Sequence, residues 1–424
     1  MATRKTTTTK TTIIENASIL LGPDLEYVER GFIEIEGGLI KSAGAGGIGG
    51  SRREEARRLD AGGFLVMPGL INAHTHIADS MGKDIGAGRR LDARVHPVVG
   101  AKKAILEKSR PEHLEALMRS SALSMLQKGI TTFCDFREGG PEGIRMLRRA
   151  VAGLPIKCVA LGRAEHYYYY HSSQADRQGD NDPLPQQAVA QAEEVLKLAD
   201  GLGISGANEN TDAALVQYGE LAAAKLVAIH AAESKETVEL SLARTGRSEV
   251  ERVMEHLKPD VVVHMTNASD SDIALVAGRN AGVVVCPRAN GVLGAGVPRV
   301  ADMLEKGCQI AIGTDNVMLN SPDVFRELDY IWKVSHAQGR FIEPQELVRM
   351  ATANAARMLG LNSGFIEAGR AADLVFISKR HADLYPVHDP YAAIVHRASA
   401  ASVAAVMAGG HWFVAMPPGG GGGL

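Results

Sequence analysis

Two histidines separated by one residue, His74 and His76, follow an apolar segment at residues 64–71. In a β-strand, side chains two residues apart point to the same side, so both imidazoles could bind one metal ion. Alone, this pair is a weak signal, because 14 histidines in 424 residues give roughly half such a pair by chance. A site is predicted only if other polar groups occupy comparable positions.

Three further polar residues stand at the ends of apolar segments. His230 ends the segment 228–230, His264 ends the segment 261–264, and Asp315 follows residues 311–314. Polar groups at the ends of buried strands need a partner or a solvent-filled cleft, so we expect these to share one site. Glu233 lies three residues after His230 and either joins this site or starts a helix, where the helix dipole favours an acidic residue.

The elements that must position these residues alternate in type between residues 66 and 361. Apolar segments that read as strands end near residues 76, 136, 162, 206, 230, 264, 287 and 314, with amphipathic stretches such as 112–128 and 186–198 between them. Eight strand–helix units over roughly 250 residues predict a (β/α)8 TIM barrel, whose active site lies at the carboxyl ends of its strands. A doubly wound sheet is the alternative, but no GxGxxG turn follows the first strand.

The two flanks of this region are rich in short strands and glycine turns, at residues 12–65, 373–377 and 401–410. We therefore predict an α/β fold in which the barrel is joined by a small β-sandwich domain formed from both termini. The expected division is a disordered tail at 1–12, a composite β domain at 13–65 plus 366–416, the catalytic barrel at 66–365, and a glycine-rich tail at 417–424.

Composition excludes several classes of function. The net charge is −3 and aromatic residues make up 5% of the chain, which argues against a partner that is a nucleic acid or a membrane. The four cysteines are far apart and lie in or beside apolar segments, as expected for free thiols in a reducing compartment. We expect a cytoplasmic protein with no signal peptide and no membrane span.

Seven motifs resemble, in their order along the chain, those of the amidohydrolase superfamily. They are VMPGLINAHTH at 66–76, HAAE at 230–233, VH at 263–264, CPRAN at 286–290, GTDN at 313–316, ATANAA at 351–356 and GRAADLV at 369–375. The resemblance spans nearly the whole chain. It is greatest to the branch that holds cytosine deaminase, guanine deaminase, adenosylhomocysteine deaminase and triazine chlorohydrolases.

The resemblance implies a set of metal ligands and a set of catalytic residues. The ligands of one divalent metal would be His74, His76, His230 and Asp315; the catalytic residues would be Glu233, His264 and Asp315. Zinc is the expected ion, with Fe²⁺ and Mn²⁺ as alternatives. The bridging lysine of two-metal members is missing from residues 203–209, which favours a single ion. Glu209 belongs to the same stretch, and a second metal stays an alternative if its carboxylate points into the site.

Substrate contacts are expected from residues near the strand ends, namely Arg137, Arg163, Arg288 and Asn290. Together they could hold an oxygen-rich or anionic substrate; the alternative for each arginine is a solvated surface charge. The run Tyr167 to Tyr170 could cover a planar ring of the substrate, pack within its own loop or form a subunit contact. The protein could therefore be a homo-oligomer. The remaining histidines, His96 among them, are expected to be structural or exposed.

The predicted function is hydrolytic deamination of an amino-substituted N-heterocycle, such as a nucleobase, nucleoside or pterin, with release of ammonia. In an alternative function the same metal site hydrolyses a different bond, namely that of a cyclic amide or amidine, or a carbon–chlorine bond. A non-catalytic scaffold is a second alternative, and it is disfavoured because all four implied ligands are present.

Overall fold

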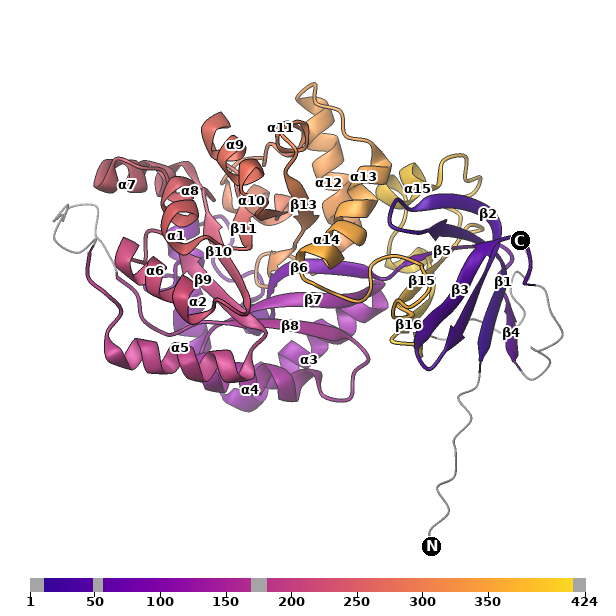
Figure 1. Ribbon diagram of the computed structural model, residues 1–424, viewed down its shortest axis with the longest axis horizontal. Coiled ribbons are helices and arrows are strands. Elements are labelled where there is room, and N and C mark those ends of the chain that lie inside the picture. Colours follow the sequence, from indigo (N-terminus) through magenta and orange to yellow (C-terminus); the bar gives the residue numbers. More distant parts are fainter. Residues whose placement is uncertain (1–10, 49–55, 169–180, 415–424) are drawn as a thin grey trace, which may run out of the picture.

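The computed structural model describes residues 11–48, 56–168 and 181–414. Figure 1 shows two parts side by side: a helix-covered barrel and, beside it, a β-rich unit that contains strands from both ends of the chain. The tails predicted at 1–12 and 417–424 lie outside the described residues, except that Thr11 is described and Thr12 begins the first strand.

The barrel is built from nine strand segments, all parallel to their neighbours. They are β6 (Leu70–His76), β7 (Ile130–Arg137), β8 (Lys157–Gly162), β9 (Gly201–Gly206), β10 (Leu226–Ala231), β11 (Val261–His264), β12 (Gly282–Val285), β13 (Gln309–Ile312) and β14 (Asp315–Asn316). The short β14 follows β13 after two residues and pairs with β6, with Asp315 opposite Thr75. β13 and β14 therefore form one interrupted eighth strand, which closes the sheet and confirms the predicted (β/α)8 fold.

Helices cover the outside of the barrel, as the alternation in the sequence predicts. They include α3 (Pro111–Gln127), α4 (Gly140–Val151), α5 (Gln186–Leu198), α6 (Asp212–Leu221), α7 (Lys235–Thr245), α9 (Asp270–Gly278), α10 (Pro287–Leu293), α11 (Val300–Glu305), α12 (Val324–Ala337), α13 (Pro344–Met350) and α14 (Ala353–Met358). The strands are covered on both sides because barrel strands face side chains inside and helices outside, and every residue of β6, β7, β11 and β12 is buried.

The second unit is an eight-stranded mixed sheet, made from β1 (Thr12–Leu21), β2 (Glu26–Glu36), β3 (Leu39–Ala45), β4 (Arg57–Asp60), β5 (Phe64–Pro68), β15 (Leu374–Ser378), β16 (Val403–Ala408) and β17 (His411–Val414). In this sheet β5 lies between β1 and β15, so strands from both termini share one layer. Gly69 separates β5 from β6 and is the point where the chain passes from this sheet into the barrel. The exact division into domains stays a prediction.

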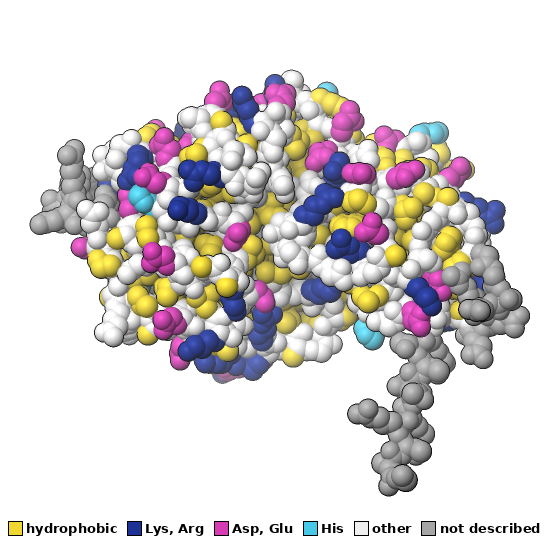
Figure 2. All heavy atoms as spheres, viewed as in Figure 1, with side chains coloured by type: hydrophobic (Ala, Val, Ile, Leu, Met, Phe, Trp, Pro, Cys, Tyr) yellow, Lys and Arg dark blue, Asp and Glu magenta, His cyan; other side chains and the backbone are white. Residues whose placement is uncertain are grey.

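The surface and the thiols agree with the composition. Basic and acidic side chains are mixed over the face shown in Figure 2, as expected for a net charge of −3. All four cysteines are free, and Cys134, Cys286 and Cys308 are buried. Within residues 11–48, 56–168 and 181–414, no helix combines the length and the apolar character that crossing a bilayer requires.

Candidate active site

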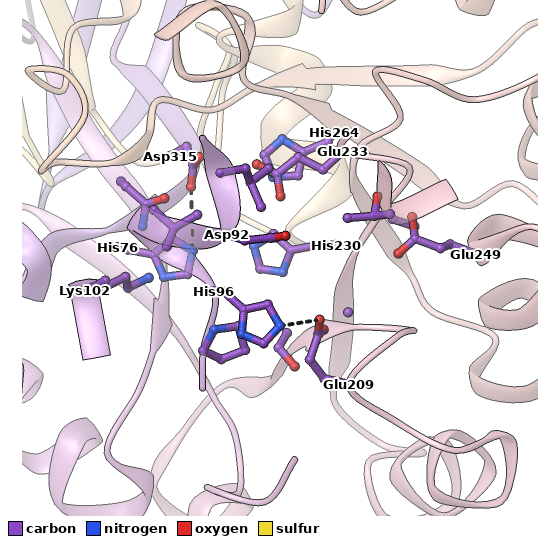
Figure 3. A pocket seen from close by; sticks show the side chains of 18 of the residues that line it. His76, Asp92, His96, Lys102, Glu209, His230, Glu233, Glu249, His264 and Asp315 are labelled. Atoms are coloured by element: carbon purple, nitrogen blue, oxygen red, sulfur yellow. Dashed lines mark ion pairs between the residues drawn. The ribbon is translucent and has the colours of Figure 1, made fainter. Parts of the chain in front are cut away.

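The five polar residues at the predicted strand ends converge at the carboxyl end of the barrel. His74 and His76 come from β6, His230 from β10, His264 from the end of β11, and Asp315 from the start of β14. All five are buried, and Figure 3 shows His76, His230, His264 and Asp315 facing a common space. The closed topology places β14 beside β6, so Asp315 meets the histidine pair although about 240 residues separate them in sequence.

Their ligand atoms are close enough to share one ion. His74, His76 and His230 form one group and His74, His264 and Asp315 a second, each with ligand atoms within 4.8 Å of one another. The distance from Asp315 Oδ1 to His74 Nε2 is 3.3 Å, and to His76 Nε2 it is 3.7 Å. Three imidazoles and a carboxylate at such distances are a typical donor set for a divalent transition metal.

His74 shows that these residues fit a metal. Its side chain is completely buried, Nδ1 has no hydrogen-bond partner among the described residues, and Nε2 faces only Asp315, at 3.3 Å. Burial lowers the pKa of His74 to about 3, so the ring is neutral and carries a free lone pair. An unpaired buried nitrogen is costly, and a bound cation would satisfy it.

The other two predicted histidine ligands are held by their Nδ1 atoms, which leaves Nε2 for the centre of the site. His230 Nδ1 lies 3.0 Å from the carbonyl oxygen of Ile204, and His76 Nδ1 lies 2.9 Å from Oε1 of Glu138. Such outer contacts fix the orientation of a ligating imidazole.

His264 is held by Asn290. The ring Nδ1 of His264 lies 3.2 Å from the side-chain nitrogen of Asn290, which is completely buried. The backbone of His264 has φ of 79° and that of Asp315 has φ of 58°. Positive φ is unfavourable for residues other than glycine, and such conformations often occur at functional sites, where the surrounding structure maintains them.

Glu233 faces His264, with Oε1 3.6 Å from Nε2. Helix α7 begins at Lys235 with Ser234 as its N-cap, so Glu233 precedes the helix and does not belong to its first turn. Burial, and then the negative charge of Asp315, raise the pKa of Glu233 well above that of an ordinary carboxyl group. Glu233 therefore holds its proton at a pH where an exposed glutamate would have lost it.

Asp315 has the opposite shift. Burial opposes its ionisation, but the adjoining His74 imidazole and the fields of His264 and His76 outweigh burial and lower the pKa of Asp315. The site thus holds two carboxyl groups whose pKa values are shifted in opposite directions. Two carboxyl groups with opposite pKa shifts in one pocket are a common arrangement for general acid–base catalysis.

The pocket in front of these residues has lining that the sequence analysis missed. Asp92, His96 and Lys102 reach it from the long segment between β6 and β7, and Glu249 reaches it from α8 (Glu249–Arg252). His96, which was expected to be structural or exposed, therefore lines the pocket. The length of the segment after the first strand was the available signal, because long loops at the carboxyl end of a barrel commonly line its active site.

The four predicted substrate residues are not all at the pocket. Arg163 lines it, and Asn290 lies behind His264. Arg137 lines a neighbouring cavity, and Arg288 lines a separate one, where its Nη1 lies 3.2 Å from Glu327 Oε1.

Glu209 lines the pocket opposite His96, with 3.7 Å between Oε1 and Nε2. Among the described residues it belongs to neither group of potential metal ligands. Tyr167 lines the cavity that neighbours the pocket, and the Tyr168 hydroxyl donates to the carbonyl of Pro183. Tyr169 and Tyr170 lie outside the described residues.

Comparisons with known proteins agree with this geometry. The chain is 38% identical over 394 residues to a protein of Methanothermobacter thermautotrophicus named "Putative aminohydrolase", covering 92% of this chain and 96% of the relative. It is 30% identical over 366 residues to the 5-methylthioadenosine/S-adenosylhomocysteine deaminase of Halobacterium salinarum, covering 81% and 80%.

The fold is shared with solved structures. An adenosine deaminase from Xanthomonas campestris with bound zinc superposes with a TM-score of 0.81 at 22% identity, covering 95% of this chain and 92% of that one. The model of the amidohydrolase family matches residues 65–413, which include both the barrel and the C-terminal strands. This chain therefore belongs to the amidohydrolase family.

Proposed function

We propose that this protein is a metal-dependent hydrolytic deaminase that converts an amino-substituted N-heterocycle, of the nucleobase, nucleoside or pterin kind, to its oxo form and ammonia. The observation that carries the proposal is that Glu233, 3.6 Å from His264, shares one pocket with Asp315 and a cluster of histidines; the raised pKa of Glu233 and the lowered pKa of Asp315 agree with it. Deamination needs both groups, because one proton must leave the attacking water and another must reach the departing amine.

The metal would be held by His74, His76, His230 and Asp315, and zinc is the ion we expect. The completely buried His74, whose Nδ1 has no hydrogen-bond partner among the described residues and whose Nε2 lies 3.3 Å from Asp315, supports this assignment. When bound, a divalent metal supplies Lewis-acid activation of the water nucleophile. One ion per chain is proposed, because Glu209 stands apart from the donor groups.

The protein residues carry the protons. Asp315, which is ionised, accepts the proton of the attacking water, and Glu233 donates its proton to the ring nitrogen of the substrate. His264, held by Asn290, orients the water and the developing oxygen anion. Glu233 then takes the remaining proton of the attacking oxygen and passes it to the departing amine, and the proton held by Asp315 restores Glu233. Water and the C–NH2 group are thereby converted to C=O and NH3, and both carboxyl groups return to their starting state.

A screen for ammonia tests this proposal. Purified zinc-loaded protein is incubated with aminopurines, aminopyrimidines, pterins and adenosine derivatives, with the variant His230→Ala as the metal-site control. We expect ammonia from at least one class with the wild type and none with the variant. Chloride release, or opening of a cyclic amide without ammonia, would instead support the alternative hydrolases.

Metal analysis is the companion measurement. We expect one equivalent of zinc per chain after dialysis, and two retained equivalents would contradict the single-ion proposal. A cytoplasmic location and a homo-oligomeric state stay predictions.

A further inference from the structure

One buried carboxylate, Glu138, lies at the centre of a charged cluster behind the metal site. Its Oε1 is 2.9 Å from His76 Nδ1, 2.6 Å from Lys102 Nζ and 3.1 Å from Arg163 Nη2. Its Oε2 is 2.9 Å from Arg137 Nη2. All five side chains are largely buried, with 4–11% of each exposed.

The contact that holds His76 differs from the contact that holds His230, the other proposed ligand with a bound Nδ1 atom. His230 is held by a neutral backbone carbonyl, whereas His76 is held by a carboxylate. A carboxylate is the stronger acceptor for an imidazole N–H. It fixes the proton on Nδ1, so that the lone pair of Nε2 points to the side where Asp315 lies.

We propose that Glu138 is a positioning residue for the metal site: it orients His76 and makes its imidazole a stronger ligand, while Lys102, Arg137 and Arg163 hold the Glu138 carboxylate in place. This inference rests on the metal site of the proposed function. It gives the cluster a role that stability alone does not explain, because burying several charges together is often no better for stability than apolar packing.

The cluster also accounts for the positions of the cations. Arg137 ends β7, Arg163 follows β8, and Lys102 belongs to α2 (Ala101–Lys108). Three separate elements therefore direct positive charge at one carboxylate. For Arg137, this contact replaces the substrate contact expected from its place at a strand end.

The variant Glu138→Gln tests the proposal through zinc affinity, measured by competition with a chromophoric chelator. Glutamine keeps the shape and an acceptor oxygen but loses the charge. Because outer contacts of metal ligands typically contribute a factor of 10–100 to metal affinity, we expect zinc to bind about 10-fold or more weakly. Glu138→Ala, which lacks the acceptor as well, should bind zinc more weakly still.

Glu165→Gln is the matched control. Glu165 is a carboxylate in the same region, and it accepts hydrogen bonds from the Gly139 backbone and the Tyr167 hydroxyl. None of these partners is a proposed metal ligand, so the Glu165→Gln variant should bind zinc with the affinity of the wild type. Equal zinc affinity of Glu138→Gln and this control would overturn the proposal.

A milder variant covers the case in which Glu138→Gln does not fold. Lys102→Met removes one of the three cations and leaves the carboxylate in place, so we expect a few-fold loss of zinc affinity; no loss would overturn the proposal. Failure of the deaminase proposal would show separately, as zinc binding without ammonia release. A wild type that does not bind zinc would overturn both.

Discussion

At the scale of single residues, the site is defined by what burial does to neighbouring carboxyl groups. Glu233 and Asp315 both lose water, yet Asp315 lies beside imidazoles that favour its charge, while Glu233 lies in the field of Asp315. The same desolvation therefore accompanies pKa shifts in opposite directions, as the proposed roles of acid and base require. The His264 ring lies in the same site, with its Nε2 atom 3.6 Å from Glu233 Oε1.

Replacing Glu233 by glutamine should separate proton transfer from metal binding. Glutamine keeps the size and polarity of the side chain but cannot release and regain a proton. We expect zinc content and KM close to wild type and a loss of about 10²-fold or more in kcat, within the range of general acid–base groups. Steady-state ammonia release and metal analysis on the same sample measure this.

The comparison variant is His230→Ala, which should lose zinc and activity together because it removes a proposed ligand. Near-normal turnover of Glu233→Gln with full metal would show that Glu233 is not the proton carrier.

At the scale of elements, the interrupted eighth strand brings the aspartate to the histidines. Gly313 and Thr314 separate β13 from β14, and the Thr314 backbone donates to the carbonyl of His74 at 3.0 Å. A side chain on Gly313 would come within 2.7 Å of His74 Cβ and 3.0 Å of Cys286 Sγ. The close approach of these two strands therefore depends on the absence of a Cβ atom.

Gly313→Ala should accordingly displace His74, a proposed metal ligand, from its position. Overpacking a rigid core typically costs about 1–3 kcal/mol, and the first atom displaced belongs to a proposed ligand. We expect a lower midpoint of thermal unfolding and weaker zinc binding. Gly278→Ala is the control, because that glycine ends α9 with no atom within 4 Å of the new methyl group. If both variants behave alike, the contact with His74 is unimportant.

Glu249 gives a prediction about pH. Burial raises the pKa of Glu249 to about 7 from an ordinary value of 4.5, so the folded state binds this proton more tightly than the unfolded chain does. The resulting stabilisation is complete below about pH 4.5 and is lost as the pH rises through 7. Since one pKa unit corresponds to about 1.4 kcal/mol, the loss is roughly 3 kcal/mol.

Glu249→Gln should remove this dependence. Its carboxylate accepts hydrogen bonds from the Ala232 backbone and the Asn208 side chain, and glutamine keeps an acceptor there. Urea unfolding of metal-free protein between pH 5 and 9 should show a smaller fall in unfolding free energy for the variant than for the wild type. Parallel curves would contradict the assignment.

At the scale of the whole molecule, the two ends of the chain support the strand that enters the site. β5 pairs with β1 on one side and β15 on the other, and it continues through Gly69 into β6. The Gly69 backbone also donates to the carbonyl of Asp373 at 2.8 Å. The mixed sheet therefore anchors the strand that carries His74 and His76.

Deleting residues 369–424 should for this reason abolish folding of the whole chain. The deletion removes β15, β16 and β17 and leaves β5 as an open edge with an exposed apolar face. We expect insoluble protein, or soluble protein without a cooperative unfolding transition by circular dichroism. Deleting residues 417–424 alone leaves all described strands intact and should have no such effect. A folded, active protein from the longer deletion would contradict this.

The sequence by itself determined the barrel and the residues expected at its mouth. Parallel strands in a closed barrel bring their carboxyl ends together, so local motifs ending in His76, His230, His264 and Asp315 were sufficient to predict one site. Only the tertiary structure decided what surrounds them. Glu138 meets His76 across 62 positions, and His96 and Lys102 enter the pocket from a long segment whose path depends on packing.

The arginines show the same limit of prediction from the sequence. Arg137, Arg163 and Arg288 all stand at or shortly after the ends of their strands. Arg137 and Arg163 both contact Glu138 and only Arg163 of the three also lines the pocket, whereas Arg288 pairs with Glu327. A place at a strand end determines only where the backbone of the residue lies. The direction of a long side chain is fixed by the charges that other elements bring to it, and those charges are distant in sequence.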